Sequence, residues 1–108
     1  MTQHWRIHPD NPQPRLLKQA ADRLMAGDLI VMATDASYVL ACRIGDKSAM
    51  ERLRRLRELD DSHHLTLMCR DLSEIGAYAK VDNSVFRLLK AHTPGPYTFI
   101  LPGTREVP

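Results

Sequence analysis

The sequence predicts an α/β domain, in which helices cover a β-sheet. Amphipathic helical segments alternate with short apolar runs along the chain, an alternation typical of this fold class. Apolar residues make up 44% of the 108 residues and charged residues 26%, a balance typical of a folded domain with one modest core. The first residues lack a signal-peptide core, and no apolar run approaches the ~18–20 residues of a membrane span. We therefore expect a cytoplasmic protein without a membrane partner.

The first expected element is a helix over about residues 14–26, after the helix-breaking stretch HPDNPQP. Gly27 is suited to end this helix, because it can adopt the left-handed conformation without a Cβ penalty. The apolar residues of the helix recur with a 3.6-residue period: Leu16, Leu17, Ala20, Ala21 and Leu24. The next run, DLIVMAT, is apolar throughout and indicates a strand that is buried on both faces.

A second strand is expected over about residues 38–44, after a tight connection through residues 35–37. The two runs could form an antiparallel hairpin or one bent strand, and the sequence leaves both open. Asp46 then caps a helix that is expected to reach about Leu59. Three apolar residues of this helix are spaced to face the core: Met50, Leu53 and Leu56.

The second half of the chain repeats the alternation of strands and helices. LTLMC predicts a third strand over residues 65–69. Asp71 and Glu74 form a capping-box-like helix start, and another helix begins at Asp82. The turn TPGP then leads into a fourth predicted strand over residues 97–101.

Both cysteines, Cys42 and Cys69, lie inside apolar runs, so we expect buried free thiols. A disulfide is not expected in a reducing cytoplasm, and neither cysteine has a second thiol at zinc-ligand spacing. His63 and His64 are adjacent, and adjacent residues of a strand point to opposite faces, which disfavours a shared metal ion. We therefore predict no metal site.

The helix after Asp46 is strongly basic, although the net charge of the chain is only +2. Its five cations are Lys47, Arg52, Arg54, Arg55 and, near its end, Arg57, set against Glu51. The simplest interpretation is a solvated helix face. The functional interpretation is a phosphate-contacting surface, because arginine forks match phosphate oxygens and such contacts make binding salt-sensitive. No Walker loop, G-x-G-x-x-G run or G-x-S-x-G elbow is present, and no catalytic residue can be assigned.

Three runs, in this order and spacing, resemble those of the YrdC/YciO family. Residues 33–38, ATDASY, occupy the place of the family's P-T-[DE]-x-x-[YF] run. Residues 57–63, RELDDSH, stand where a K-x-R-P-x-x-K-like segment is expected, with the conservative Arg57 at its first position and departures at Leu59, Asp60 and His63. Residues 94–98, PGPYT, match the family's P-G-P-x-T turn. The resemblance covers essentially the whole chain and is greatest to the YciO branch.

The resemblance implies a twisted open mixed sheet with helices packed on it. It also implies the family's chemistry, in which threonine, bicarbonate and ATP form threonylcarbamoyl-adenylate for tRNA modification. ATP would be a substrate, with or without Mg²⁺, and no tightly bound prosthetic group is expected. The residues implied for the substrate are Thr34, Tyr38 and Arg57, and those implied for the nucleotide are Ser62, His63 and Thr98. Without the resemblance, strand preference explains the two threonines equally well, and core packing is the alternative for the tyrosine.

Two functions from different classes remain open on the sequence. One is a nucleotidyltransferase of the L-threonylcarbamoyladenylate synthase type. The other is a non-catalytic module that binds double-stranded RNA or tRNA in the same cavity, with Lys47, Arg52, Arg54 and Arg55 as the contacts. Family members are longer, so we expect residues 1–108 to be the N-terminal portion of a single YrdC-like domain, incomplete at its C-terminal end. The open sheet edge that this leaves would favour a homo-oligomer.

Overall fold

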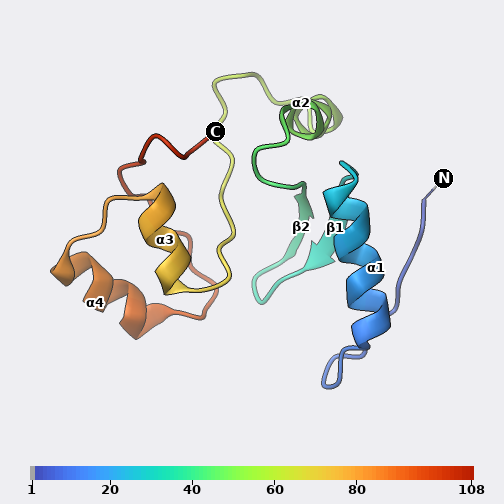
Figure 1. Ribbon diagram of the computed structural model, residues 1–108, viewed down its shortest axis with the longest axis horizontal. Coiled ribbons are helices and arrows are strands. Elements are labelled where there is room, and N and C mark those ends of the chain that lie inside the picture. Colours follow the sequence, from blue (N-terminus) through green and yellow to red (C-terminus); the bar gives the residue numbers. More distant parts are fainter. Residues whose placement is uncertain (1) are drawn as a thin grey trace. The chain divides into compact units, whose positions relative to one another are not determined.

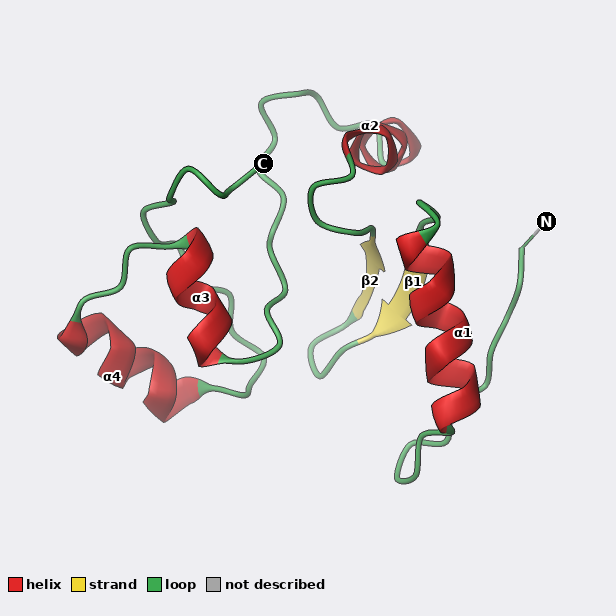
Figure 2. Ribbon diagram, in the orientation of Figure 1, coloured by secondary structure: helices red, strands yellow, loops and turns green. Residues whose placement is uncertain are grey.

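The computed structural model describes residues 2–108. Its elements, in chain order, are α1 (Pro14–Met25), β1 (Ile30–Ala33), β2 (Tyr38–Ala41), α2 (Lys47–Leu56), α3 (Leu72–Tyr78) and α4 (Asn83–His92) (Figure 1). The two strands pair in one sheet, and helices and loops form the rest of the chain (Figure 2). The fold class is therefore α/β, as the sequence predicts. Within residues 2–108, no helix has the length and apolar character needed to cross a membrane.

Two compact units make up the described chain. Unit 1 comprises the described residues up to Met32 together with Tyr38–Asp61, and unit 2 comprises Ala33–Ser37 and Ser62–Pro108. Unit 1 therefore holds α1, α2 and most of the hairpin, whereas unit 2 holds the hairpin turn, α3 and α4. That residues 1–108 form the N-terminal portion of one domain stays a prediction.

Helix α1 confirms the predicted helix to within one residue at its end. Pro14 occupies its first turn, where a missing N–H costs nothing, and Gly27 follows it in the left-handed region with φ 96°. The half-buried members of the predicted apolar stripe are spaced four residues apart: Leu16, Ala20 and Leu24. Leu17 is 48% exposed, so the covered stripe is narrower than the sequence suggests.

Strands β1 and β2 form an antiparallel hairpin, which resolves the choice that the sequence leaves open. The backbone N–H of Thr34 donates to the carbonyl of Ser37 at 2.8 Å, and this register sets the ends of the two strands opposite each other. Strand β2 ends before the predicted residue 44, because β1 offers no partner beyond Ile30. The expectation that the first strand is buried on both faces is wrong: Val31 is 68% exposed. A two-stranded sheet with one covered face leaves alternate side chains in solvent.

Helix α2 begins as predicted, with the Asp46 carboxylate accepting the N–H of Ala49 at 3.0 Å. It ends at Leu56 rather than at Leu59, because the chain closes it with a Schellman motif. The N–H of Leu59 donates to the carbonyl of Arg54 at 2.8 Å, and Glu58 takes the left-handed conformation with φ 56°.

The core of unit 1 differs from the predicted helix face in one residue. Ala49 and Leu53 are buried, with 1% and 7% of their surface exposed, and Met50 is half-buried. Leu56 is 66% exposed, although it shares the helical face of Ala49 and Leu53. It lies in the last turn of α2, beyond the part of the helix that is covered.

In unit 2, aspartates start both helices, as the sequence predicts. The Asp71 carboxylate accepts the N–H of Glu74 at 3.2 Å, while the Glu74 carboxylate accepts the N–H of Arg70 at 3.2 Å. This reciprocal arrangement satisfies backbone donors at the start of α3. Asp82 caps α4 by accepting the N–H of Val85 at 2.8 Å, and Leu89 of α4 is the most deeply buried side chain of unit 2, with 1% exposed.

The C-terminal segment is tied to the end of α3. Ala79 and Gly103 form an isolated antiparallel bridge, flanked by a 2.8 Å hydrogen bond from the Lys80 N–H to the carbonyl of Pro102. The Thr104 hydroxyl also donates to the carbonyl of Ala77, at 2.6 Å. Three successive contacts therefore hold residues 102–104 against α3.

The third and fourth predicted strands are not strands in the described chain. Residues 65–69 and 97–101 have no secondary-structure assignment and no ladder partner within residues 2–108. Their apolar sequences suit strands, but a strand exists only where another backbone supplies hydrogen bonds. Because any partner would be remote along the chain, short-range sequence patterns could not reveal its absence.

Candidate functional site

The hairpin turn fixes the side chain of Thr34. Its hydroxyl donates to the carbonyl of Ser37 at 2.6 Å and accepts the N–H groups of Ala36 and Ser37 at 3.2 and 3.0 Å. A hydroxyl has one donor and two acceptor lone pairs, so the turn occupies all of them. Thr34 therefore shapes the turn in this structure.

Tyr38, the first residue of β2, presents its ring to solvent. Its side chain is among the most exposed of the large apolar residues, at 78%. The alternative that Tyr38 packs in the core is therefore wrong. The ring stands directly after the hairpin turn, where it is accessible to a ligand.

Two arginines of α2 line an open hollow in unit 1. Leu29, Arg52, Arg55 and Leu56 line this hollow, which has a volume of about 340 Å³. Arg52 and Arg55 lie one turn apart on the same flank of the helix, and Arg52 also donates to the carbonyl of Gly27 at 3.4 Å. Two leucines and two arginines therefore line the hollow, a combination that suits an anionic ligand with an apolar part.

The remaining predicted RNA contacts lie on the other flank of α2. Lys47 is exposed in the first turn, and Arg54 is half-buried. The charge of Arg54 acts on the thiol of Cys42, whose pKa it tends to lower. Lys47 is therefore more accessible to a ligand than Arg54. The charge of Arg54 acts partly on Cys42, within unit 1.

Arg57 lies where the sequence places it, at the end of α2. Its backbone N–H donates to the carbonyl of Leu53 at 3.1 Å, and its side chain is exposed. Ser62 and His63 are exposed in the loop that follows. Arg57 belongs to unit 1, whereas Ser62 and His63 belong to unit 2.

Thr98 is exposed beside a small aromatic cluster of unit 2. The ring of Tyr97 meets the ring of His92 edge-on, with 5.8 Å between centroids and an interplanar angle of 88°, and meets Phe99 at 6.4 Å. His92 is itself held at the end of α4 by a 2.9 Å hydrogen bond between its Nδ1 and the carbonyl of Leu88. The histidine thus contacts Tyr97, the residue before Thr98.

The structure divides the predicted site residues between the units. Unit 2 contains Thr34, Ser62, His63 and Thr98, and unit 1 contains Tyr38, Arg57, Lys47, Arg52, Arg54 and Arg55. The four residues in unit 2 come from three separate family runs, which the fold collects in one compact body.

Both cysteines are free and half-buried rather than fully buried. Burial raises the pKa of the Cys42 thiol, and the nearby carboxylate of Asp46 raises it further. Burial also raises the pKa of Cys69, with added repulsion from Glu74 and Asp71. A raised pKa keeps the thiol protonated and weakly nucleophilic. Neither cysteine is suited to nucleophilic catalysis.

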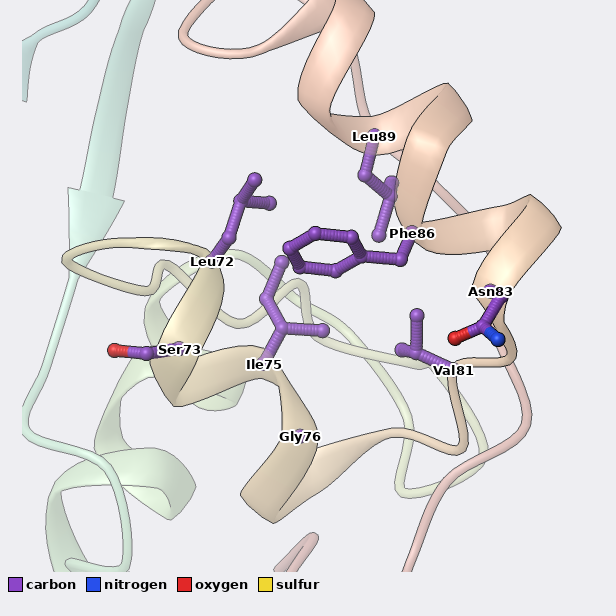
Figure 3. A pocket seen from close by; sticks show the side chains of 8 residues that line it. All are labelled: Leu72, Ser73, Ile75, Gly76, Val81, Asn83, Phe86 and Leu89. Carbon is purple, nitrogen blue, oxygen red and sulfur yellow. The ribbon is translucent and has the colours of Figure 1, made fainter.

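Sequence reasoning missed an apolar groove between α3 and α4. Figure 3 shows Leu72 and Ile75 of α3 facing Phe86 of α4, with Leu89 next to Phe86 on the same helix. The groove has a volume of about 300 Å³ and offers packing contacts without acid–base groups. Helical spacing of apolar residues in both helices was the available signal. Leu29, which lines the unit 1 hollow, was also missed.

Within residues 2–108, no group of histidine, cysteine and carboxylate side chains could hold a metal ion.

Comparison with known proteins relates the whole chain to one group. YciO of Escherichia coli K12, a protein described as uncharacterized, is 58% identical over all 108 residues, which make up 52% of YciO. The crystal structure of E. coli YciO superimposes with a TM-score of 0.92 over the complete chain and 52% of its own. A Threonylcarbamoyl-AMP synthase of Chromobacterium violaceum is 33% identical over 101 residues, which are 93% of this chain and 52% of the synthase. The chain thus spans about half the length of the curated relatives it matches.

A family model, Sua5/YciO/YrdC, described as "Telomere recombination", matches residues 22–108. These residues include α2, both strands, α3, α4 and all three runs noted in the sequence. The match therefore covers most of the chain and the candidate site as well. The chain belongs to the Sua5/YciO/YrdC family.

Proposed function

We propose that the chain supplies part of a threonylcarbamoyl-AMP synthase-type activity, in which threonine, bicarbonate and ATP combine and pyrophosphate leaves. The observation that carries this proposal is the 33% identity to the Chromobacterium violaceum synthase over 93% of the chain. The exposure of Tyr38, Arg57 and Thr98 supports it, because residues on turns and loops can meet a ligand without opening the core.

The proposed roles follow the chemistry of each side chain. The ring of Tyr38 packs against the substrate, and the Arg57 guanidinium pairs with a negative charge of the substrate. Ser62, His63 and Thr98 contact the nucleotide through hydroxyl and imidazole groups. The hydroxyl of Thr34 donates to the carbonyl of Ser37 and so fixes the turn that precedes Tyr38.

Calorimetric titration of ATP into the 108-residue chain, with and without threonine and bicarbonate, tests this function. A synthase site binds its substrates together, so threonine should tighten ATP binding. Arg57→Ala should weaken ATP binding by about tenfold, the equivalent of ~1.4 kcal/mol, without changing the melting temperature. Arg15→Ala, which removes an exposed cation of α1, is the matched control and should leave ATP binding unchanged.

Two results would contradict the proposed synthase function. One is ATP binding that does not respond to threonine. The other is an Arg57→Ala variant that binds ATP normally, or that loses stability instead of affinity.

RNA binding without turnover is a second candidate, favoured by the two arginines that line the unit 1 hollow. Phosphate oxygens would pair with Arg52 and Arg55, and Lys47 and Arg54 would add charge from the other flank. The affinity for double-stranded RNA should then fall steeply with salt, because each phosphate contact releases counterions. Arg55→Ala should reduce the salt slope by about one and weaken binding to all sequences equally.

Filter binding across a salt series measures that slope, with Arg15→Ala again as the control for total charge. Salt-insensitive binding, or an Arg55→Ala slope equal to the wild type, would exclude the α2 surface as an RNA contact. The synthase proposal is unaffected by that outcome, because it depends on Arg57 and the nucleotide loops.

A further inference from the structure

The unit 1 hollow offers apolar surface and positive charge to the same ligand. Its lining combines Leu29 and Leu56 with Arg52 and Arg55. Leu29 is half-buried, whereas 66% of the Leu56 surface and the side chains of both arginines are exposed. A ligand that brought apolar atoms to Leu56 would remove that surface from water, which stabilises a complex in proportion to the area covered.

The charge of the two arginines is not neutralised by the described chain. Arg52 and Arg55 lie one helical turn apart, a spacing at which like charges repel. Among residues 2–108, no ion pair joins either guanidinium to a carboxylate. Glu51 lies four residues before Arg55 without pairing with it, and the Asp28 carboxylate is already paired with Arg23 at 2.6 Å. An acidic ligand would therefore supply the counter-charge that α2 lacks on this flank.

The open form of the hollow favours a segment of a macromolecule over a small molecule. Small-molecule sites enclose most of the ligand surface, whereas this hollow is bounded by a few side chains of α2 and by Leu29. A segment of a larger partner can be held by contacts outside the hollow as well.

The mixed lining distinguishes a protein partner from RNA. An RNA backbone would pair with Arg52 and Arg55 but would bring phosphate and sugar groups, rather than apolar ones, to Leu56. Protein interfaces commonly combine arginine with apolar side chains in the same patch. The two leucines therefore favour a protein over a nucleic acid at this position.

We propose that the unit 1 hollow is a docking site for an acidic, apolar segment of a partner protein. The segment carries two carboxylates about one helical turn apart, and they pair with Arg52 and Arg55. Between the carboxylates, a large apolar side chain packs on Leu29 and Leu56. This docking goes beyond the synthase function, which depends on Arg57 and the nucleotide loops.

Fluorescence anisotropy with synthetic peptides tests the proposal. The probe is a labelled amphipathic helix of about sixteen residues, built from glutamate, leucine and alanine with glutamates one turn apart beside leucines. It should bind the 108-residue chain. Two matched peptides, one with glutamine for glutamate and one with alanine for leucine, should each bind about tenfold more weakly or worse. The first loses the charge pairing and the second loses the apolar contact.

Substitutions in the chain assign the binding to the hollow. Arg55→Ala and Leu56→Ser should each weaken binding of the acidic peptide by about tenfold. Both residues are exposed, so the variants should fold as the wild type does. Arg15→Ala and Leu17→Ser, which change an exposed cation and an exposed leucine of α1, are the matched controls and should leave binding unchanged.

A charge reversal separates loss of the docking site from loss of the fold. The double variant Arg52→Glu, Arg55→Glu should no longer bind the acidic peptide. It should instead bind a matched peptide with lysine for glutamate, because complementary charge selects the partner. A variant that had lost its fold would bind neither peptide, and circular dichroism would show the lost helices.

Several results would overturn the proposal. They are an acidic peptide that does not bind the wild-type chain, equal weakening by either α1 control, and full binding of the glutamine or alanine peptide. Double-stranded RNA that binds more tightly than the acidic peptide and displaces it would assign the two arginines to RNA. A stable dimer of the chain that excludes the peptide would assign the hollow to a second copy.

Discussion

Four apolar runs of this chain have strand-like sequences, but two form a sheet and two do not. β1 and β2 are joined by a turn of four residues, Thr34 to Ser37, which brings the second run back onto the first. Residues 65–69 and 97–101 have no neighbouring run along the chain, so they depend on a remote backbone. Closing a short loop costs little entropy, and a local hairpin therefore forms where equally apolar remote segments stay unpaired.

The two units also differ in the charged and candidate-site residues that they contain. Unit 1 holds the basic helix α2 and the open hollow, and unit 2 holds the unpaired segments, the PGPYT run and parts of the other two family runs. Each unit has its own buried side chains, Leu53 in one and Leu89 in the other. The paired strands thus belong mainly to unit 1, with the basic helix, and the unpaired runs belong to unit 2.

Removing the central side chain of unit 2 should have the largest effect. Leu89→Ala should destabilise unit 2 by about 3 kcal/mol, the range for a buried leucine whose cavity does not collapse. Hydrogen exchange should accelerate in α3 and α4 while the β1–β2 hairpin keeps its protection. Equal loss of protection in the hairpin would show that the two units unfold as one.

A pair of proline substitutions tests the difference between paired and unpaired runs directly. Val39→Pro removes an N–H that the hairpin register places opposite Met32, and it should cost about 2 kcal/mol. Thr66→Pro falls in a run without backbone partners and should change stability by less than about 0.5 kcal/mol. Chemical denaturation followed by circular dichroism measures both variants. A large cost at Thr66 would mean that residues 65–69 have a partner after all.

The helix caps should have a smaller and more uniform effect. Asp46→Ala in unit 1 and Asp82→Ala in unit 2 each remove one carboxylate that accepts a backbone N–H, at 3.0 and 2.8 Å. Each should cost about 1 kcal/mol of unfolding free energy. Denaturant midpoints of the two variants, each against wild type, would show whether local capping works alike in both units. Markedly unequal costs would mean that one cap is supported by tertiary contacts.

The smallest effect expected is a pH dependence at the start of α3. The Ser73 hydroxyl, bonded to the Asp71 carboxylate at 2.5 Å, holds the pKa of Asp71 below its ordinary value, with help from the Glu74 N–H. A depressed folded-state pKa stabilises the helix above the ordinary value and loses that stabilisation as pH falls through the folded value. NMR shifts of α3 should therefore show fraying in strong acid.

Asp71→Asn is the control for that titration, because an amide caps the helix but does not ionise over this pH range. The acid-induced fraying should disappear in this variant and weaken in Ser73→Ala. Fraying that persists in Asp71→Asn would assign the titration to another group.

The sequence predicts where some candidate residues lie in the chain, whereas their role in a site stays a prediction. Thr34 lies in the hairpin connection and Arg57 at the end of α2, as predicted, but Thr98 lies in a run that is not a strand. The hydrogen bonds that engage the Thr34 hydroxyl depend on the conformation of the turn, which residue type alone does not specify. The hollow beside Arg52 and the groove between α3 and α4 depend on which elements pack together, and the helical spacing of apolar residues indicates only that α3 and α4 each have an apolar face.

The sequence by itself determined the helices and the aspartate caps of α2, α3 and α4, because caps and helical periods act over a few residues. Tertiary structure decided the rest. It ended α2 at Leu56, where Glu58 takes the left-handed conformation, and it left Leu56 exposed. Within residues 2–108, it gave residues 65–69 and 97–101 no strand partner. The apolar character of a segment indicates only that the segment favours burial. What covers that segment depends on which surfaces the folded chain and its partners bring to it.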